Sequence, residues 1–136
     1  MSAQSLWPVQ AAVYARLSGD EALGGLLPAN RIFDAVPADS PFPYIALGDM
    51  SARAADTQGT SGYDITLDID AYSRGTGMKE ARALMRAVYD CLHNQSFTVE
   101  GQTLLLCLEV ESSCSLLADG RTRRSTQRFH LVTEPV

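Results

Sequence analysis

The sequence lacks the patterns that mark a membrane-spanning protein, a disulfide framework or the common nucleotide-binding enzymes. None of its apolar runs approaches the roughly 20 residues that are needed to cross a bilayer. Its three cysteines are an odd number, and none lies in a CxxC pair that would indicate a zinc site or a thioredoxin motif. No Walker loop is present either. We therefore expect no cofactor and no membrane association, and a function that depends on architecture rather than on a catalytic signature.

Lysine is almost absent, since Lys79 is accompanied by ten arginines. The formal net charge of −5 argues against a protein that holds nucleic acid by neutralising phosphates, although it permits one that DNA merely passes. Arginine in place of lysine is typical of bidentate interface contacts. It is also typical of a GC-rich genome, and the sequence leaves both interpretations open.

Length and composition indicate one globular domain over residues 1–136. The hydrophobic fraction of 46% and the charged fraction of 20% are ordinary for such a domain, and the chain is long enough to bury its own core. The first five residues carry no basic region, and no apolar segment follows them. We therefore expect no signal peptide and a cytoplasmic site of synthesis.

Three prolines between Arg31 and Gly48 exclude a helix there. Pro37, Pro41 and Pro43 fix their own φ angles and push each preceding residue out of the helical region. The segment should be a stiff, extended connector that leads into a strand at 44–50. Because proline donates no backbone hydrogen bond, the point where the connector enters this strand should lie at a strand end or at a sheet edge.

Residue periodicity predicts the remaining elements. Apolar residues at helical spacing predict main helices over 5–18, capped by Ser5, and over 78–93, and Asp20 should cap a short turn at 21–23 that Gly24 ends. Small polar residues predict a long mobile loop at 51–62. The expected strands are 44–50, 63–72, 97–99, 103–116 and 122–133. This order predicts an α+β domain, with two main helices on a mostly antiparallel sheet of four to five strands.

Apolar and polar residues alternate most strictly in the strand at 63–72, which should bury one face only. Its inner face comprises Tyr63, Ile65, Leu67, Ile69 and Ala71, and its outer face carries Asp64, Thr66, Asp68, Asp70 and Tyr72. The strand at 103–116 should place Leu104, Leu106, Leu108 and Val110 on one face, and the last strand should set Arg124, Arg128 and His130 opposite Phe129 and Leu131.

The acidic face of Asp64, Asp68 and Asp70 admits two interpretations. These carboxylates could bind a metal, joined by Glu109, Glu111 and His130 from neighbouring strands. Alternatively, the face is solvated or faces another subunit, and it pairs with Arg123, Arg124 and Arg128 within or between subunits. Tyr72 and Arg74, at the end of the best strand, likewise suit either an interface or an ordinary strand end.

Taken in order, these pieces resemble the tail-completion, or tail-terminator, family of long-tailed phages and phage-like gene transfer agents. The resemblance extends from about Val9 to Leu131. The pieces that carry it are Val13-Tyr14-Ala15-Arg16-Leu17 with Asp20-Glu21-Ala22-Leu23, Arg31-Ile32-Phe33-Asp34 with Val36-Pro37, Phe42-Pro43-Tyr44 before Gly48, Tyr72-Ser73-Arg74, and Asp119-Gly120 before Thr122-Arg123.

The resemblance implies a structural virion protein rather than an enzyme. Such a protein is expected to assemble in the bacterial cytoplasm into a six-fold ring on the tail tube, at the junction with the neck. It would stop tube polymerisation, contact the tube and the head-completion or neck proteins, and let DNA pass through its lumen. A closed ring needs two different faces on each subunit. The outer-strand acids and arginines, with Tyr72 and Arg74, are the candidate interface residues, and the loop at 51–62 would reach a neighbour.

Three other functions remain open from the sequence. Within the same class, the chain could be a neck or head-completion ring protein or a tail-tube subunit. From another class, it could be a small metal-dependent hydrolase or nuclease that uses the Asp64, Asp68 and Asp70 face. A small monomeric binding protein without an assembly role is the third.

Overall fold

The computed structural model describes residues 2–27, 31–54, 62–75 and 77–135. The helices are α1 (Ser2–Ser18), α2 (Glu21–Leu26) and α3 (Lys79–Leu92). The strands are β1 (Ile32–Phe33), β2 (Tyr44–Ala54), β3 (Tyr63–Ser73), β4 (Gln102–Leu116) and β5 (Arg123–Pro135). Among these residues, no helix has both the length and the apolar character that a membrane span requires.

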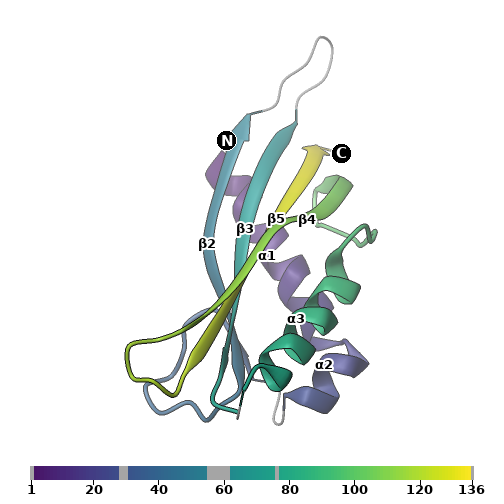
Figure 1. The fold of residues 1–136 in the computed structure, drawn as a ribbon. Coiled ribbons are helices and arrows are strands. Elements are labelled where there is room, and N and C mark those ends of the chain that lie inside the picture. The colour runs from purple at the N-terminus through teal and green to yellow at the C-terminus, as the bar shows by residue number, and fades with distance from the viewer. Residues whose placement is uncertain (1, 28–30, 55–61, 76, 136) are drawn as a thin grey trace.

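The strands form one sheet in the order β1-β2-β3-β5-β4. Only the short β1–β2 pair is parallel, and the other neighbours are antiparallel. Helices α1 and α3 pack on the sheet and contact each other, and the helices lie on one side of it (Figure 1). The prediction of an α+β domain with a mostly antiparallel sheet is therefore confirmed.

The core lies between the helices and the inner face of the sheet. Strand β3 alternates as predicted, with every second residue from Ile65 to Ala71 buried. Strand β5 buries Phe129 and Leu131 beside it, while α1 contributes Val9, Val13 and Leu17. The apolar stripe of α3 completes this cluster with Leu84, Val88 and Leu92, among others.

The two N-terminal helices differ from the prediction at their ends. Helix α1 begins at Ser2 instead of being capped by Ser5, so Pro8 lies beyond the first turn, where it deletes one backbone hydrogen bond. Asp20 does cap α2, because its side chain accepts a hydrogen bond of 3.1 Å from the Leu23 amide. Helix α2 nevertheless continues through Gly24 to Leu26, since buried Leu23 and Leu27 anchor it on both sides of the glycines.

The predicted face of β4 is wrong because the strand is irregular. Its register with β5 shifts between Leu104 and Leu106 and again between Glu109 and Glu111. An extra residue in one strand moves the residues after it to the other face. Leu104 and Cys107 consequently pack on the core, whereas Val110 is 56% exposed.

Two further boundaries are corrected, and one is confirmed. Residues 97–99 form no strand; Val99 makes only an isolated bridge to Gln102, across a turn in which Gly101 has φ 74°. The residues 51–54, predicted as loop, continue β2 because Ala52 packs on the core. The rest of that predicted loop, at 55–61, lies outside the described residues. The proline connector does deliver the chain into β2 at Tyr44, as predicted.

Candidate functional site

The outer face of the sheet neutralises part of its own charge. Arg128 and Asp68 are direct partners across β5 and β3, and their side chains form a two-pronged pair with Nε–Oδ1 at 2.9 Å and Nη2–Oδ2 at 3.2 Å. Glu111 lies 3.6 Å from the same guanidinium. The predicted pairing of acidic and arginine-bearing strands therefore exists, and for these residues it lies within one chain.

The remaining acids of this face do not converge on one point. Asp64 lies 3.5 Å from His130 and four residues along β3 from Asp68, the partner of Arg128. Asp70 faces Gly48, and its Oδ1 is buried without a hydrogen-bond partner in the described structure. Glu109 lies on the opposite face, where Gln127 Nε2 donates to it at 2.7 Å.

The metal hypothesis thus loses two of its proposed ligands. The Asp68 carboxylate is already paired with Arg128, and Glu109 lies on the face of the sheet opposite to the other carboxylates. Over the parts of the chain that the structure describes, no group of three or more His, Cys, Asp or Glu side chains is placed to hold a metal ion.

Tyr72 belongs to an aromatic cluster beside the proline connector, rather than standing free at a strand end. Its ring stacks on that of Tyr44, with centroids 4.9 Å apart, and Tyr44 in turn contacts Phe42 at 5.2 Å and Phe33 at 6.0 Å. Burial, more than any charge, raises the pKa of Tyr44. The Arg74 guanidinium lies over the Phe42 ring at 4.1 Å, a cation–π contact that fixes the connector against the end of β3.

Arg74 also ties this cluster to the turn between β4 and β5. Its Nε donates to Thr122 Oγ1 at 2.9 Å, and its Nη2 lies 3.5 Å from Asp119. Asp119 accepts hydrogen bonds from the backbone amides of Arg121 and Thr122, both at 2.9 Å, and from Thr122 Oγ1 at 2.6 Å. Gly120 supplies the positive φ of 71° that the turn requires.

Asp119 should make the stability of this turn dependent on pH. The Thr122 hydroxyl, then the two backbone amides, hold the pKa of its carboxyl well below the ordinary value. A carboxyl with a lowered folded-state pKa stabilises the fold above its unfolded pKa and loses that contribution as the pH falls. We expect the Asp119→Ala variant to unfold more easily than the wild type at about pH 7, and the difference to shrink by about pH 3.

Urea unfolding of both proteins at the two pH values measures this effect. Asp39→Ala is the matched control, because Asp39 is exposed on the neighbouring connector and forms no ion pair in the described structure. A difference between wild type and Asp119→Ala that is independent of pH would contradict the assignment.

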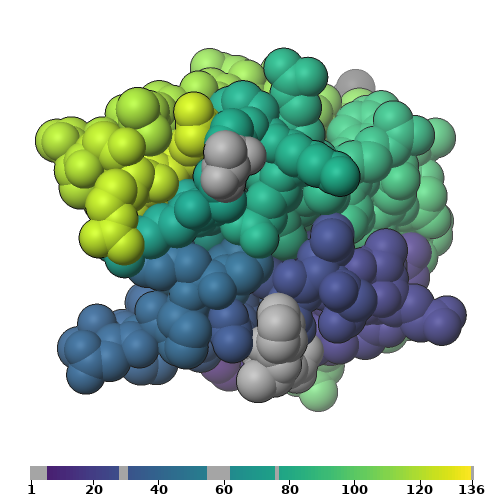
Figure 2. All heavy atoms as spheres, turned by 60° about the horizontal axis from the view of Figure 1, so that its bottom comes forward, coloured from purple at the N-terminus to yellow at the C-terminus, as the bar shows by residue number. Residues whose placement is uncertain are grey.

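The turn and the strand ends beside it form an arm that projects from the body of the molecule. We define the hairpin arm as residues 111–124. Most of its β4 positions are exposed, and Leu116 is 52% exposed. Figures 1 and 2 show this arm and the proline connector projecting on the same side of the molecule. Arg121, Arg123 and Arg124 lie on the arm, and none of them forms an ion pair with another described residue.

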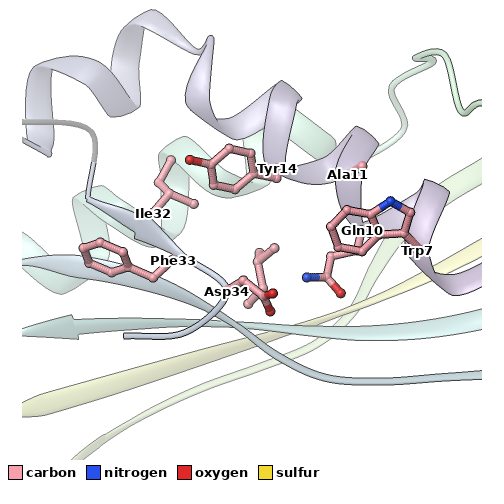
Figure 3. A pocket seen from close by; sticks show the side chains of 8 residues that line it. Trp7, Gln10, Ala11, Tyr14, Ile32, Phe33 and Asp34 are labelled. Carbon is pink, nitrogen blue, oxygen red and sulfur yellow. The ribbon is translucent and has the colours of Figure 1, made fainter. Parts of the chain in front are cut away.

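A groove lies at the other edge of the sheet, between α1 and β1. It has a volume of about 420 Å³ and is lined mainly by Trp7, Tyr14, Phe33 and Asp34 (Figure 3). Trp7 is 66% exposed and Tyr14 is 39% exposed, which is unusual for aromatic residues of a small domain. We name this the α1–β1 groove.

Some of these residues are predictable from the sequence, and others are not. The sequence predicts Arg74, Arg123 and Arg124 as interface candidates. It does not predict the partners of Arg74, or that Arg128 is paired while Arg123 and Arg124 form no ion pair. The groove was missed because Trp7 and Tyr14 lie outside the apolar stripe of α1. Their placement off that stripe, on a helix with few charges, was the available signal.

Cys91 and Cys107 are buried and should be inert, whereas Cys114 lies on the hairpin arm. Burial raises the pKa of the Cys91 thiol to about 11 and that of Cys107 to about 12. Since the thiolate is the reactive form, we expect iodoacetamide to alkylate half-exposed Cys114 first in the native protein. Peptide mass spectrometry against reaction time tests this order. Urea-unfolded protein, in which all three should react alike, is the control; early labelling of Cys107 in the native state would contradict the burial.

Comparison with known proteins places this architecture in a family. Residues 11–134 match the tail completion protein gp17 family. Tail completion protein gp17 of Bacillus phage SPP1 is 28% identical over 94 residues, which are 69% of each chain. A chain in the structure of the virion of a native gene transfer agent particle aligns with a TM-score of 0.84 and 25% identity, covering 93% of this chain and 94% of that one. The chain therefore belongs to the tail completion protein gp17 family.

Proposed function

We propose that the chain is the subunit of a ring, six-fold by the family resemblance, that closes the phage-type tail tube. The ring stops tube polymerisation, joins the tube to the head-completion or neck proteins, and lets DNA pass through its lumen. The observation that carries this proposal is the match over 11–134, supported by the near-complete overlap with a chain of a gene transfer agent virion.

The surface chemistry agrees with a closed ring. Ring closure by identical subunits joins two different faces of each subunit. The outer sheet face, the hairpin arm and the α1–β1 groove offer such distinct faces. The net charge of −5 suits a lumen that does not grip the DNA phosphates.

The eight candidate interface residues divide into three groups in this proposal: residues with a partner in the same subunit, arginines without an ion pair, and Asp70. Asp64, Asp68, Arg128, Tyr72 and Arg74 have partners within the subunit, so they shape the contact surfaces. Arg123 and Arg124 have no such ion pair and would bind a neighbour directly. Arg124 and Asp70 lie on the outer face of the sheet, whereas Arg123 is the cross-strand partner of buried Ser73 and lies on the inner side.

Electron microscopy of growing tail tubes tests the proposal. Tagged protein is added to tubes assembling from purified tube subunits, and the tag is visualised by negative stain. We expect one labelled end per tube and no further growth at that end. A control without the protein should give tubes of unlimited length. Labelled heads with unlabelled tubes would assign the protein to the neck, and labelling along the tube wall would assign it to the tube itself.

A further inference from the structure

We propose that the hairpin arm of one subunit seats in the α1–β1 groove of the next copy in the ring. This inference rests on the proposed function, because it specifies how the subunits of the proposed ring meet. The groove is therefore the acceptor and the arm the donor of one head-to-tail contact.

The exposed apolar residues are divided between the two edges of the sheet. Strand β1 forms one edge and β4 the other. Among the described residues, the exposed large hydrophobic side chains are Trp7, Tyr14 and Val36 around the β1 edge, and Leu105, Val110 and Leu116 on β4. Different sets of exposed apolar side chains at opposite edges suit a head-to-tail contact, whereas a two-fold dimer pairs one surface with itself. Of the three on β4, Leu116 lies on the hairpin arm.

The charges of the arm and the groove are complementary. The arm presents the exposed guanidinium groups of Arg121 and Arg124. The groove presents the exposed carboxylate of Asp34, which forms no ion pair within the described chain, beside the aromatic rings of Trp7 and Tyr14. An arginine in this groove could pair with the carboxylate and lie against an aromatic face, while Leu116 covers apolar surface.

The arm is already held in one shape before any partner binds. Asp119 closes its turn with three hydrogen bonds, and Leu117 donates its amide to the Thr122 carbonyl at 2.7 Å. Arg74 fixes the same turn to Phe42 of the connector. A rigid arm loses little conformational freedom on docking, which favours affinity. The anchoring also keeps the arm at the connector of its own chain, so the groove it fills belongs to another copy.

Photocrosslinking in assembled particles tests the contact directly. Tyr14 is replaced by p-benzoylphenylalanine in the tagged full chain, produced in cells that assemble particles. We expect crosslinks between two copies, at peptides from the hairpin arm. The same amino acid at Arg82, exposed on α3, is the control and should give no crosslink to the arm. Crosslinks from position 14 to another protein, to DNA, or to a different part of the chain would overturn the contact.

Charge exchange provides a second test that does not depend on the unnatural amino acid. We expect Arg121→Asp with Arg124→Asp, or Asp34→Arg alone, to reduce incorporation into particles by about tenfold or more, because each change opposes like charges at the contact. The three changes combined should restore incorporation, and Arg82→Asp should leave it unchanged. Circular dichroism verifies that each variant folds.

The two proposals fail in distinguishable ways. Wild-type chain that is absent from purified particles would contradict the proposed function. Wild-type chain that is present in them, together with a combined variant that remains as defective as its parents, would overturn the docking of arm and groove alone.

Discussion

Replacing Phe129 by alanine is expected to lower the free energy of unfolding by about 4 kcal/mol. Phe129 is completely buried on β5, the strand between β3 and β4, and lies opposite Leu67 of β3. The truncation removes the largest buried side chain of the sheet and leaves a cavity that strands paired on both sides cannot collapse to fill. Since small domains have total stabilities of about 5–15 kcal/mol, this loss is a large fraction of the whole.

Urea denaturation monitored by circular dichroism measures this effect. Leu105→Ala is the matched control, because Leu105 is a large apolar residue of the same sheet but is 53% exposed. We expect the control to lose less than about 1 kcal/mol. An equal decrease in the free energy of unfolding of the two variants would show that the inner face of β5 is not the centre of the core.

Replacing Gln127 by leucine is expected to cost about 2 kcal/mol, although the substitution makes the core more apolar. Gln127 is 2% exposed, and its Nε2 donates to the Met85 carbonyl of α3 at 2.9 Å and to Glu109 Oε1 of β4 at 2.7 Å. It therefore joins a helix and two strands by one amide group. Leucine would leave the Glu109 carboxylate without this donor in partly buried surroundings, which is the costly part of a lost hydrogen bond.

A double-mutant cycle with Glu109→Leu separates this cost from changes in packing. If the cost arises from the Glu109 carboxylate that has lost its donor, Glu109→Leu in the Gln127→Leu background should recover part of the lost stability. Removing both partners removes the unpaired group. Thermal unfolding of the four proteins gives the coupling. Strictly additive losses would show that Gln127 acts through its shape alone.

The parts of the fold that repeat a simple pattern were predictable from the sequence. Strand β3 alternates without interruption because one face meets the core and the other meets solvent, so its faces could be assigned residue by residue. The stripe of α3 is equally regular. The connector followed from its prolines, which leave few backbone conformations.

The errors lie where tertiary contacts override local pattern. The two register shifts of β4 moved Cys107 to the inner face and Val110 to solvent, and nothing in the β4 residues themselves marks those shifts. Residues 51–54 look like loop but pair with β3 because the neighbouring strand extends that far. Gly24 and Gly25 remain helical because Leu23 and Leu27 are buried on both sides of them.

The candidate site was predictable only in part, because it is assembled from segments far apart in the chain. The pairing of Asp68 with Arg128 could be anticipated as a contact between strands, but the choice of partner depends on register. Arg74 meets Thr122 across 48 positions, and Asp34 meets the aromatic residues of α1 only through the parallel β1–β2 pair. Such juxtapositions exist only in the folded chain.

The exposure of the hairpin arm has a consequence for how this protein can evolve. Substitutions in the core, as at Phe129, alter the amount of folded protein, whereas most β4 positions of the arm contact little of their own domain. Changes there leave folding nearly intact, because exposed positions contribute little to stability. The arm can therefore diverge in step with whatever it binds, while the sheet retains the same shape. A survey of all single substitutions should find the exposed β4 positions of the arm permissive for protein abundance yet restrictive for particle yield, whereas Asp119 and buried Thr122 should be restrictive for both.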